Sequence, residues 1–550
     1  MPTGRPSTRL SAASLAPEPG SSSRLARSAA SAAAATITSR ILGVVRELVI
    51  AAFFGASGMT DAYQVAFRIP NLLRDLFAEG AMSAAFIPTF TRYLTVSGKE
   101  PAWRLGNHVI NALVVVTGAL VVLGIIFAQP LIFAFAAEKF TADPVRLAVT
   151  VQMARIMVPT LTLIAVAAAF MGMLNSLHHY FIPSLSPAMF NVMTVVCAFT
   201  LVPLMPMFGL QPIVAIAIGT LLGGVAQLAL QWPTLHKEGF RYRAEIDWRD
   251  EGLRRMLTLM GPGTIGLAAT QVNVFVNTWL ATGTVVGAVS WLNYAFRLMY
   301  LPIGLFGVSI GTATLPTVSR QSTERDFVAV RETVTNGLSL MLMLNIPSMV
   351  GLIVLAQPIV RLILERGRFT PADTVATAAA LQFYAVGLIG YSVVRILSPV
   401  FYALGRNRTP VIVSMVAVLV NASLNYLFVR ELGYGYEALA LGTSLAALFN
   451  AAALAYLLRA HLHGLNEARL LGAIVRIAFA SVLMGATAFY ADELFTRWLP
   501  SHAFVVQALR LSATIGLAIV VLGGSAWLLR IREFNEGVAM VSRRLRRASR

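Results

Sequence analysis

Runs of about 20 mostly apolar residues recur along the whole chain, and this feature constrains the fold more than any other. A helix of about 20 residues is long enough to cross the roughly 30 Å hydrocarbon core of a bilayer. The chain of 550 residues is 57% hydrophobic and only 12% charged, whereas a soluble protein of that size needs far more charge to solvate its surface. The sequence therefore predicts an all-α polytopic membrane protein.

The apolar runs predict about fourteen transmembrane helices. The expected spans are residues 28–54, 60–96, 105–136, 147–176, 181–205, 212–234, 253–283, 287–319, 331–364, 375–404, 409–430, 436–459, 468–490 and 503–530. Residues 1–27 are rich in Ser, Ala, Pro and Arg, which predicts a disordered N-terminal tail.

Composition and motifs exclude several classes of protein. The single cysteine, Cys197, rules out an internal disulfide and a cysteine-based zinc cluster. Neither a phosphate-binding G-x-x-x-x-G-K-[ST] loop nor an H-E-x-x-H motif occurs, so an ATP-driven pump and a zinc protease are unsupported. No cofactor is predicted. The net charge of +18 lies mostly in connections and tails, where it indicates membrane orientation and not a nucleic-acid partner.

Positive charge alternates between successive connections. The sixth-to-seventh connection holds six basic residues between Lys237 and Arg255, whereas the next connection, "ATGTVVGA" (281–288), has no charge. Basic connections stay on the cytoplasmic side of a membrane. This alternation, together with the basic tail at 531–550, predicts that both termini are cytoplasmic.

The chain also repeats itself. "AFR" recurs at 66–68 and 295–297, "IPTFTR" (87–92) returns as "LPTVSR" (315–320), and "MGMLNSLHHYFIP" (171–183) is echoed by "YALGRNRTP" (402–410). A common offset of about 230 residues indicates two parallel six-helix repeats, a pattern typical of transporters. The expected units are an N-lobe at 28–234, a cytoplasmic linker at 235–252, a C-lobe at 253–460 and two additional helices within 461–530.

Charged residues occur inside several predicted spans. The first span carries Ser39, Arg40, Arg46 and Glu47 on one side of the helix. The others are Asp61, Arg68, Arg74, Asp75 and Glu79 in the second span, and Arg155, Arg297 and Arg395 in later spans. An intramembrane arginine costs about 2.5–3.5 kcal/mol on insertion scales, so such residues face a bundle interior or an aqueous cavity.

Two interpretations of these charges stay open. The first is structural: Arg40 pairs with Glu47, Arg68 pairs with Asp75, and residues at span ends reach toward water. The second is functional, and it is favoured for Arg40, Arg46, Arg74 and Arg297, because they come from both repeats. Arginine binds phosphate oxygens through a planar pair of donors and stays charged. A cavity lined by arginines suits an anionic, phosphate-bearing substrate.

A second polar constellation consists of amides. Asn273 and Asn277 lie one helical turn apart in the seventh span, Asn421 and Asn425 do so in the eleventh, and Thr443 lies in the twelfth. Hydrogen bonding between helices is the favoured interpretation, with a monovalent cation site as the alternative. "GPG" at 261–263 predicts a hinge in the seventh span.

The stretch "TSRILGVVREL…TDAYQVAFRIPNLLRDLFAEGAMSAAFIP" (38–88) resembles the bacterial lipid II flippase family, MurJ/MviN, of the multidrug/oligosaccharidyl-lipid/polysaccharide exporter superfamily. The resemblance continues through "SWLNYAFRLMYLPIGLFGVSIGTATLPTVSR" (290–320) and "YALGRNRTP" (402–410). It implies a fourteen-helix inner-membrane flippase with two six-helix lobes around a central cationic cavity. Such a protein carries undecaprenyl-pyrophosphate-linked peptidoglycan precursor, lipid II, from the inner to the outer leaflet for cell-wall synthesis.

The resemblance also assigns roles to residues. It places Arg40, Arg46, Arg74 and Arg297 as substrate-binding cavity arginines and Ser39 as the cavity serine. Asp61, Glu79 and Arg395 match supporting charged positions, and Glu47 stands where many members have Asp. Members with a sodium site have carboxylates at positions that match Asn277 and Asn425 here. The two helices within 461–530 resemble a groove that holds the lipid tail.

The function predicted from these features is a lipid II flippase that works by alternating access, driven by a monovalent cation or by the membrane potential. Expected partners are the lipid-linked glycan, membrane lipids and the cell-wall synthesis machinery. The rivals are a flippase for another polyprenyl-linked oligosaccharide, a multidrug exporter of the same superfamily, a polyprenyl-sugar glycosyltransferase or polymerase, and a scaffold. An exporter of cations calls for an acidic cavity, and an enzyme calls for a large outer loop with a catalytic carboxylate. Neither feature is found here.

Overall fold

The computed structural model describes residues 21–75, 80–304, 308–501 and 503–535, and every regular element in those residues is helical. Within these described residues, eight spans are long and apolar enough to cross a membrane, or nine if one bent pair counts as a span. The eight are α4 (Lys99–Ile126), α7 with α8 (Pro144–Ser176), α11 (Val214–Lys237), α15 (Phe327–Val354), α19 with the following π-turn (Arg408–Glu431), α20 (Glu437–Leu462), α21 (Glu467–Trp498) and α22 (Phe504–Leu528). The predicted all-α membrane fold is confirmed, whereas the count of fourteen stays a prediction.

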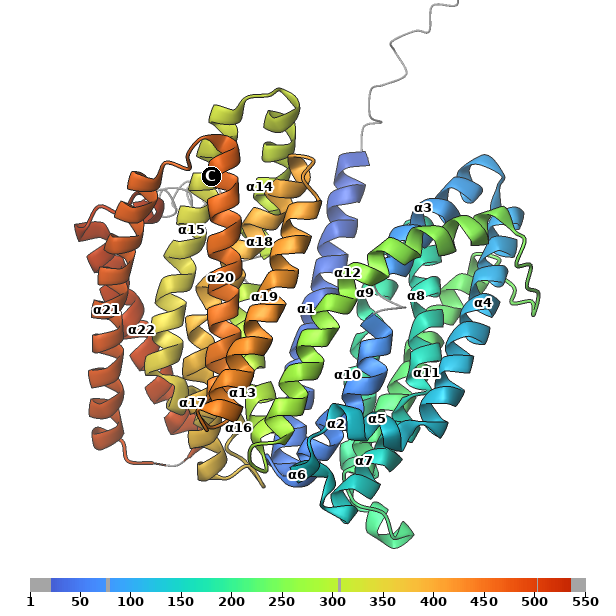
Figure 1. Ribbon diagram of the computed structural model, residues 1–550, viewed down its shortest axis with the longest axis horizontal. Helices are drawn as coiled ribbons and strands as arrows, with labels where there is room; N and C mark the ends of the chain where they lie inside the picture. Colours follow the sequence, from blue (N-terminus) through green and yellow to red (C-terminus); the bar gives the residue numbers. More distant parts are fainter. Residues whose placement is uncertain (1–20, 76–79, 305–307, 502, 536–550) are drawn as a thin grey trace, which may run out of the picture.

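Six further helices include those that carry most of the intramembrane charges. They are α1 (Ser21–Phe54), α2 (Gly58–Arg74), α3 (Gly80–Val96), α12 (Glu251–Thr282), α13 (Ala288–Pro302) and α14 (Val308–Thr323). The first of them begins at Ser21, although the sequence predicted a tail up to residue 27. Residues 261–263, the predicted hinge, lie inside α12, which continues through them as a single curved helix (Figure 1).

Several predicted single spans are broken into two helices. The breaks separate α4 from α5 (Ala128–Phe135), α7 (Pro144–Met157) from α8 (Thr160–Ser176), α9 (Phe181–Leu185) from α10 (Ala188–Thr200), α15 from α16 (Ala356–Leu364), and α17 (Pro371–Val386) from α18 (Leu388–Ala403). The last pair is bent by 41° at Gly387. There the backbone approaches α20 so closely that a Cβ would lie 2.7 Å from the Ser444 hydroxyl. Glycine therefore permits this close approach.

The helices form two groups, with α2 to α11 on one side and α13 to α22 on the other, and α1 and α12 lie between them in Figure 1. The N-terminal end of α12 packs on the first group through α3, whereas its C-terminal half contacts α13 and α19 of the second. Asp250 caps this helix by accepting a 2.8 Å hydrogen bond from the Leu253 amide. α12 therefore connects the two groups physically as well as along the chain.

The two groups meet at the end of the bundle drawn lowest in Figure 1, which we call the basal end. It comprises the turns at 55–57, 136–143, 283–287 and 365–370. Here the Arg368 amide donates to the Ala52 carbonyl at 2.9 Å, and the Ala137 amide donates to the Thr282 hydroxyl at 2.9 Å. The first joins a segment of the second group to α1, and the second joins a segment of the first group to α12. A third hydrogen bond joins the groups directly, because the Gly287 amide, just before α13, donates to Asp61 of α2 at 2.6 Å. The basal end is therefore closed.

Three glycines in left-handed backbone conformations lie at this contact. They are Gly55 (φ +61°), Gly287 (φ +94°) and Gly367 (φ +59°). A Cβ on Gly55 would collide with the Arg368 carbonyl oxygen, and one on Gly367 would collide with the Ala52 carbonyl oxygen. A Cβ on Gly287 would lie 2.7 Å from the Ala56 carbonyl. These three residues, called here the glycine seam, let the two backbones touch.

Candidate functional site: an arginine cluster between the helix groups

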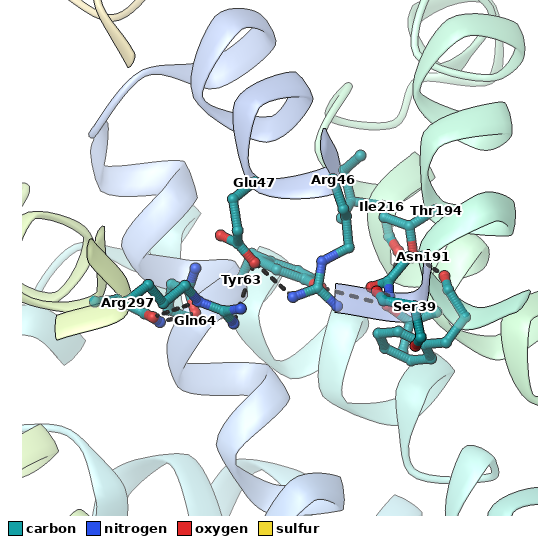
Figure 2. Close-up of polar contacts among 12 residues, drawn as sticks. Ser39, Arg46, Glu47, Tyr63, Gln64, Asn191, Thr194, Ile216 and Arg297 are labelled. Carbon is teal, nitrogen blue, oxygen red and sulfur yellow. Dashed lines mark hydrogen bonds and ion pairs between the residues drawn. The ribbon is translucent and has the colours of Figure 1, made fainter. Parts of the chain in front are cut away.

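Glu47 of α1 joins arginines from both halves of the chain. Its Oε1 atom lies 2.5 Å from Nη2 of Arg46 and 3.1 Å from Nη2 of Arg297 on α13 (Figure 2). Arg46 and Glu47 are buried, whereas the Arg297 side chain is 42% exposed. Within the described part of the chain, Nε of Arg46 and Oε2 of Glu47 are buried without a hydrogen-bond partner. The three charged side chains form one unit, in which one donor and one acceptor are still free to form hydrogen bonds.

Polar side chains of α2 and α13 meet next to this unit. Arg297 donates through Nε to Asn293 at 3.1 Å, and the Asn293 amide donates to Gln64 of α2 at 2.5 Å. Asp61, also on α2 and 2% exposed, accepts hydrogen bonds from the Gly287 amide and from the amide and hydroxyl of Ser290 at 2.6–2.9 Å. Asp61 therefore binds the N-terminal turn of α13, where the helix dipole favours a negative charge.

The remaining predicted site residues that the structure describes have partners outside this unit. Arg40 is exposed and donates to the Gly304 carbonyl at 3.4 Å, and the Ser39 carbonyl accepts from Asn191 at 3.2 Å. Arg74 pairs with Asp75 at 2.9 Å. Arg395 of α18 is exposed and donates to the hydroxyl of Tyr300. Glu79 lies outside the described residues.

The ion pairs differ from those considered from the sequence. Glu47 pairs with Arg46 and Arg297, not with Arg40. Asp75 pairs with Arg74, and its other oxygen accepts from Gln271 at 3.1 Å. The pairings Arg40–Glu47 and Arg68–Asp75 were therefore wrong, because they matched residues within one helix, whereas side chains of α12 and α13 compete for the same carboxylates.

Arginine outnumbers acid in this region. Six arginines (Arg40, Arg46, Arg68, Arg74, Arg297 and Arg395) accompany three described carboxylates (Glu47, Asp61 and Asp75), and Asp61 is engaged by the start of α13. The arrangement suits a ligand that carries several negative charges, because guanidinium groups bind such oxygens bidentately.

The predicted amide constellation forms a hydrogen-bonded chain. Asn425 donates to Asn277 at 2.7 Å and to Asn421 at 3.0 Å, Asn277 donates to Asn273 at 3.5 Å, and Asn421 donates to Thr443 at 3.1 Å. Three of the four amide oxygens therefore accept from neighbouring amides, and only Oδ1 of Asn425 is buried without a partner. A cation needs several free oxygens and usually a carboxylate. These residues do not fit a sodium site, and they match the interpretation as hydrogen bonding between helices.

Sodium is therefore expected not to stabilise the protein. Thermal unfolding in NaCl and in choline chloride at equal ionic strength should give the same midpoint, because ligands shift stability only when they bind the folded state. The matched variant is Asn425→Asp, which gives this group of hydrogen-bonded amides the carboxylate that a cation site usually has. A higher midpoint in NaCl for the unsubstituted protein would contradict this expectation.

Sequence reasoning missed several residues of the site. Gln64, Gln271, Ser290 and Asn293 were not singled out, since uncharged polar residues are common in interhelical contacts. One signal was available. Ser290 and Asn293 lie 229 residues after Asp61 and Gln64, the offset at which "AFR" recurs, and each contacts its counterpart.

The fold and the arginine cluster define a class of protein, a polytopic helical membrane protein with a cluster of arginines between two helix groups. The same fold occurs in an inward-facing multidrug resistance MATE family transporter of the MOP superfamily, which is 14% identical, with a TM-score of 0.66 over 78% of this chain and 96% of the other. The chain belongs to the lipid II flippase MurJ family, whose profile matches residues 50–509. The family prediction is confirmed.

Individual relatives agree with this assignment. The probable lipid II flippase MurJ of Vibrio cholerae is 33% identical over 506 residues, covering 90% of this chain and 95% of the relative. The lipid II flippase MurJ of Burkholderia cenocepacia is 34% identical over 411 residues, covering 74% and 79%. A solved lipid II flippase MurJ in an inward closed conformation is 27% identical, with a TM-score of 0.72 over 91% of this chain and 98% of the other. The family and the apolar helices indicate a multi-pass inner-membrane protein.

Proposed function

We propose that this protein is a flippase that moves lipid II, the undecaprenyl-pyrophosphate-linked peptidoglycan precursor, from the inner to the outer leaflet. The observation that carries the proposal is the unit of Arg46, Glu47 and Arg297, in which one carboxylate holds arginines from α1 and α13. Membership of the lipid II flippase family supports the choice of substrate.

The pyrophosphate of the substrate replaces Glu47 as the partner of the two arginines. It carries two or more negative charges into a space of low dielectric constant, where an unpaired charge is costly. Arg297 is the partly exposed member and makes the first contact, and Nε of Arg46 supplies an additional donor. Arg40, Arg74 and Arg395, together with Ser39, bind the rest of the anionic headgroup. Glu47, Asp61 and Glu79 hold the arginines and restore the resting arrangement.

Transport proceeds by alternating access between two lobes, residues 28–234 and 253–460, joined by the linker at 235–252. The basal end faces outward and is closed in this conformation, and both termini are cytoplasmic. Displacement of Glu47 from Arg297 removes an ion pair between α1 and α13, which loosens the closed basal end. α21 and α22, within 461–530, hold the lipid tail. Outward movement of each negative charge gains about 2.3 kcal/mol per 100 mV of membrane potential.

The excess of arginine argues against an exporter of cationic drugs. A flippase for another polyprenyl-linked oligosaccharide would bind the same pyrophosphate. The two candidate substrates are therefore distinguished by letting lipid II and the other lipid compete for the protein.

Depletion of the protein in its own host tests the proposal. Labelled lipid-linked precursor is followed with a periplasmic enzyme that cleaves only outward-facing headgroups. Loss of cleavage, with precursor accumulating inside, is the expected result, because the precursor cannot cross without the protein. Unchanged cleavage would mean that another protein carries out the transport, and would favour an exporter or a scaffold.

A further inference from the structure

A groove of about 570 Å³ lies between α5 and α7, away from the arginine cluster. Its floor is a stripe of α7 with members three or four residues apart, a spacing that places them on one helix face. The members used here are Leu147, Val151, Gln152, Arg155 and Ile156, and Gln129 of α5 lines the groove as well. The opposite face of α7, with Val149, Met153 and Met157, is buried in the bundle. Leu147, Gln152 and Ile156 are half-buried and Arg155 is exposed, whereas Val151 is buried at the base of the groove. The stripe is thus the less covered face of a transmembrane helix.

Arg155 is the charged residue that lines this groove. Its side chain is exposed, and Nε donates to the Ile125 carbonyl at 3.2 Å. Among the described residues, no carboxylate lies within ion-pair distance of it. Asp143, the nearest acid along the chain, caps α7 and lies 4.0 Å from Arg146. A guanidinium has five N–H donors, so most of those on Arg155 remain available to a ligand.

The surroundings of the groove are apolar and face outward. The neighbouring side chains on α4 and α5 are 49–61% exposed: Val122, Leu123, Ile126, Phe127 and Phe133. In a bundle that spans a membrane, such side chains contact lipid. Ile125 is next to the last residue of α4, so Arg155 lies where a membrane-spanning helix ends, the level at which lipid headgroups begin.

We propose that this groove binds an anionic phospholipid. The lipid phosphate accepts hydrogen bonds from Arg155, with Gln129 and Gln152 as additional amide donors, and Leu147, Val151 and Ile156 contact the apolar part of the lipid. Charge complementarity selects an anionic headgroup over a zwitterionic one, and the apolar surroundings select a lipid over a soluble anion. The site is separate from the arginine cluster and does not depend on the proposed substrate.

Native mass spectrometry of the full-length protein tests the proposal. The protein in detergent is titrated with phosphatidylglycerol and, separately, with phosphatidylcholine of the same chain length. Arg155→Gln is expected to weaken the tightest phosphatidylglycerol site about fivefold, the effect of roughly one arginine near a lipid surface, and to leave phosphatidylcholine unchanged. Ala148→Trp places a large side chain at an exposed position that lines the groove, keeps the charge, and should also remove the site.

The matched control is Arg320→Gln, which removes an exposed arginine from a different helix, α14, and should have no effect. Equal phosphatidylglycerol binding by the unsubstituted protein and Arg155→Gln would overturn the proposal, as would retention of the site in Ala148→Trp. Displacement of the lipid by excess inorganic phosphate would show that the ligand is a soluble anion, and would overturn it too. Unfolding midpoints of all variants show whether each is folded.

Discussion

Alanine in place of Arg297 is expected to abolish transport of the lipid-linked precursor while the protein still inserts into the membrane. Arg297 is partly exposed and shares Glu47 with Arg46, so it is the guanidinium that pyrophosphate reaches most easily. Loss of one partner of a hydrogen-bonded charge pair costs about 2–5 kcal/mol, which corresponds to binding weaker by roughly 30-fold to several thousand-fold. The measurement is growth of the host on each variant after depletion of the native protein.

Two further variants identify the cause of the loss. Arg297→Lys keeps the charge but cannot bind bidentately, and should give an intermediate result. Arg320→Ala removes an exposed arginine from α14, which has no assigned role in binding, and should support normal growth. Arg46→Ala should behave like Arg297→Ala. Normal growth on either alanine variant, at normal protein level in the membrane, would contradict the role assigned to the cluster.

Alanine at Gly367 or Gly55 is expected to open the basal end. The added Cβ collides with a carbonyl oxygen of the facing segment, a collision that exists only while the groups are in contact. An overpacking cost of about 1–3 kcal/mol shifts the equilibrium constant between the basal-closed and basal-open states by about 5- to 150-fold toward the open state. Spin labels at Val145 and Tyr434, which are exposed in the two groups, report the change as a longer distance. The labelled protein needs a Cys197→Ala background.

The chain offers a close control for this experiment. Gly209 has a φ of +69°, near that of Gly55 and Gly367, but a Cβ there would meet nothing within 4 Å. Gly209→Ala therefore carries the backbone strain of a left-handed alanine without the collision. If it lengthened the label distance as much as Gly367→Ala does, strain and not contact would be responsible. An unchanged distance in Gly367→Ala would mean that the seam does not hold the basal end closed.

Sequence alone was sufficient for the class of fold, and it singled out Arg46, Glu47 and Arg297, which the structure brings into contact. Arginines such as Arg46 and Arg297 stand out in apolar spans because burying a charge in a membrane is costly. The resemblance to the flippase family then assigned roles to them. Their partners were harder to predict. Glu47 is adjacent to Arg46 in sequence, but its second partner lies on α13, and no rule based on one helix includes that distant residue.

The positions at which helices break could not be predicted from the pattern of apolar residues either. Hydropathy registers whether a segment is apolar, and the residues around Phe127 and Gly387 are apolar although the helix breaks there. The bend at Gly387 depends on close contact with Ser444, which only tertiary packing specifies. Conversely, Gly and Pro at 261–263 looked like a break but lie inside α12, because neighbouring helices in a bundle can support such residues.

The contacts between α2 and α13 join positions 229 residues apart, Asp61 with Ser290 and Gln64 with Asn293, which bears on how such a chain could have evolved. In a homodimer of a six-helix ancestor, residues on the symmetry axis would meet their own copies. Two aspartates meeting there would repel each other. After gene duplication and fusion, one copy can keep the acid while the other becomes a serine that donates to it. A fused chain thereby gains an asymmetry that two identical subunits around the same axis cannot have.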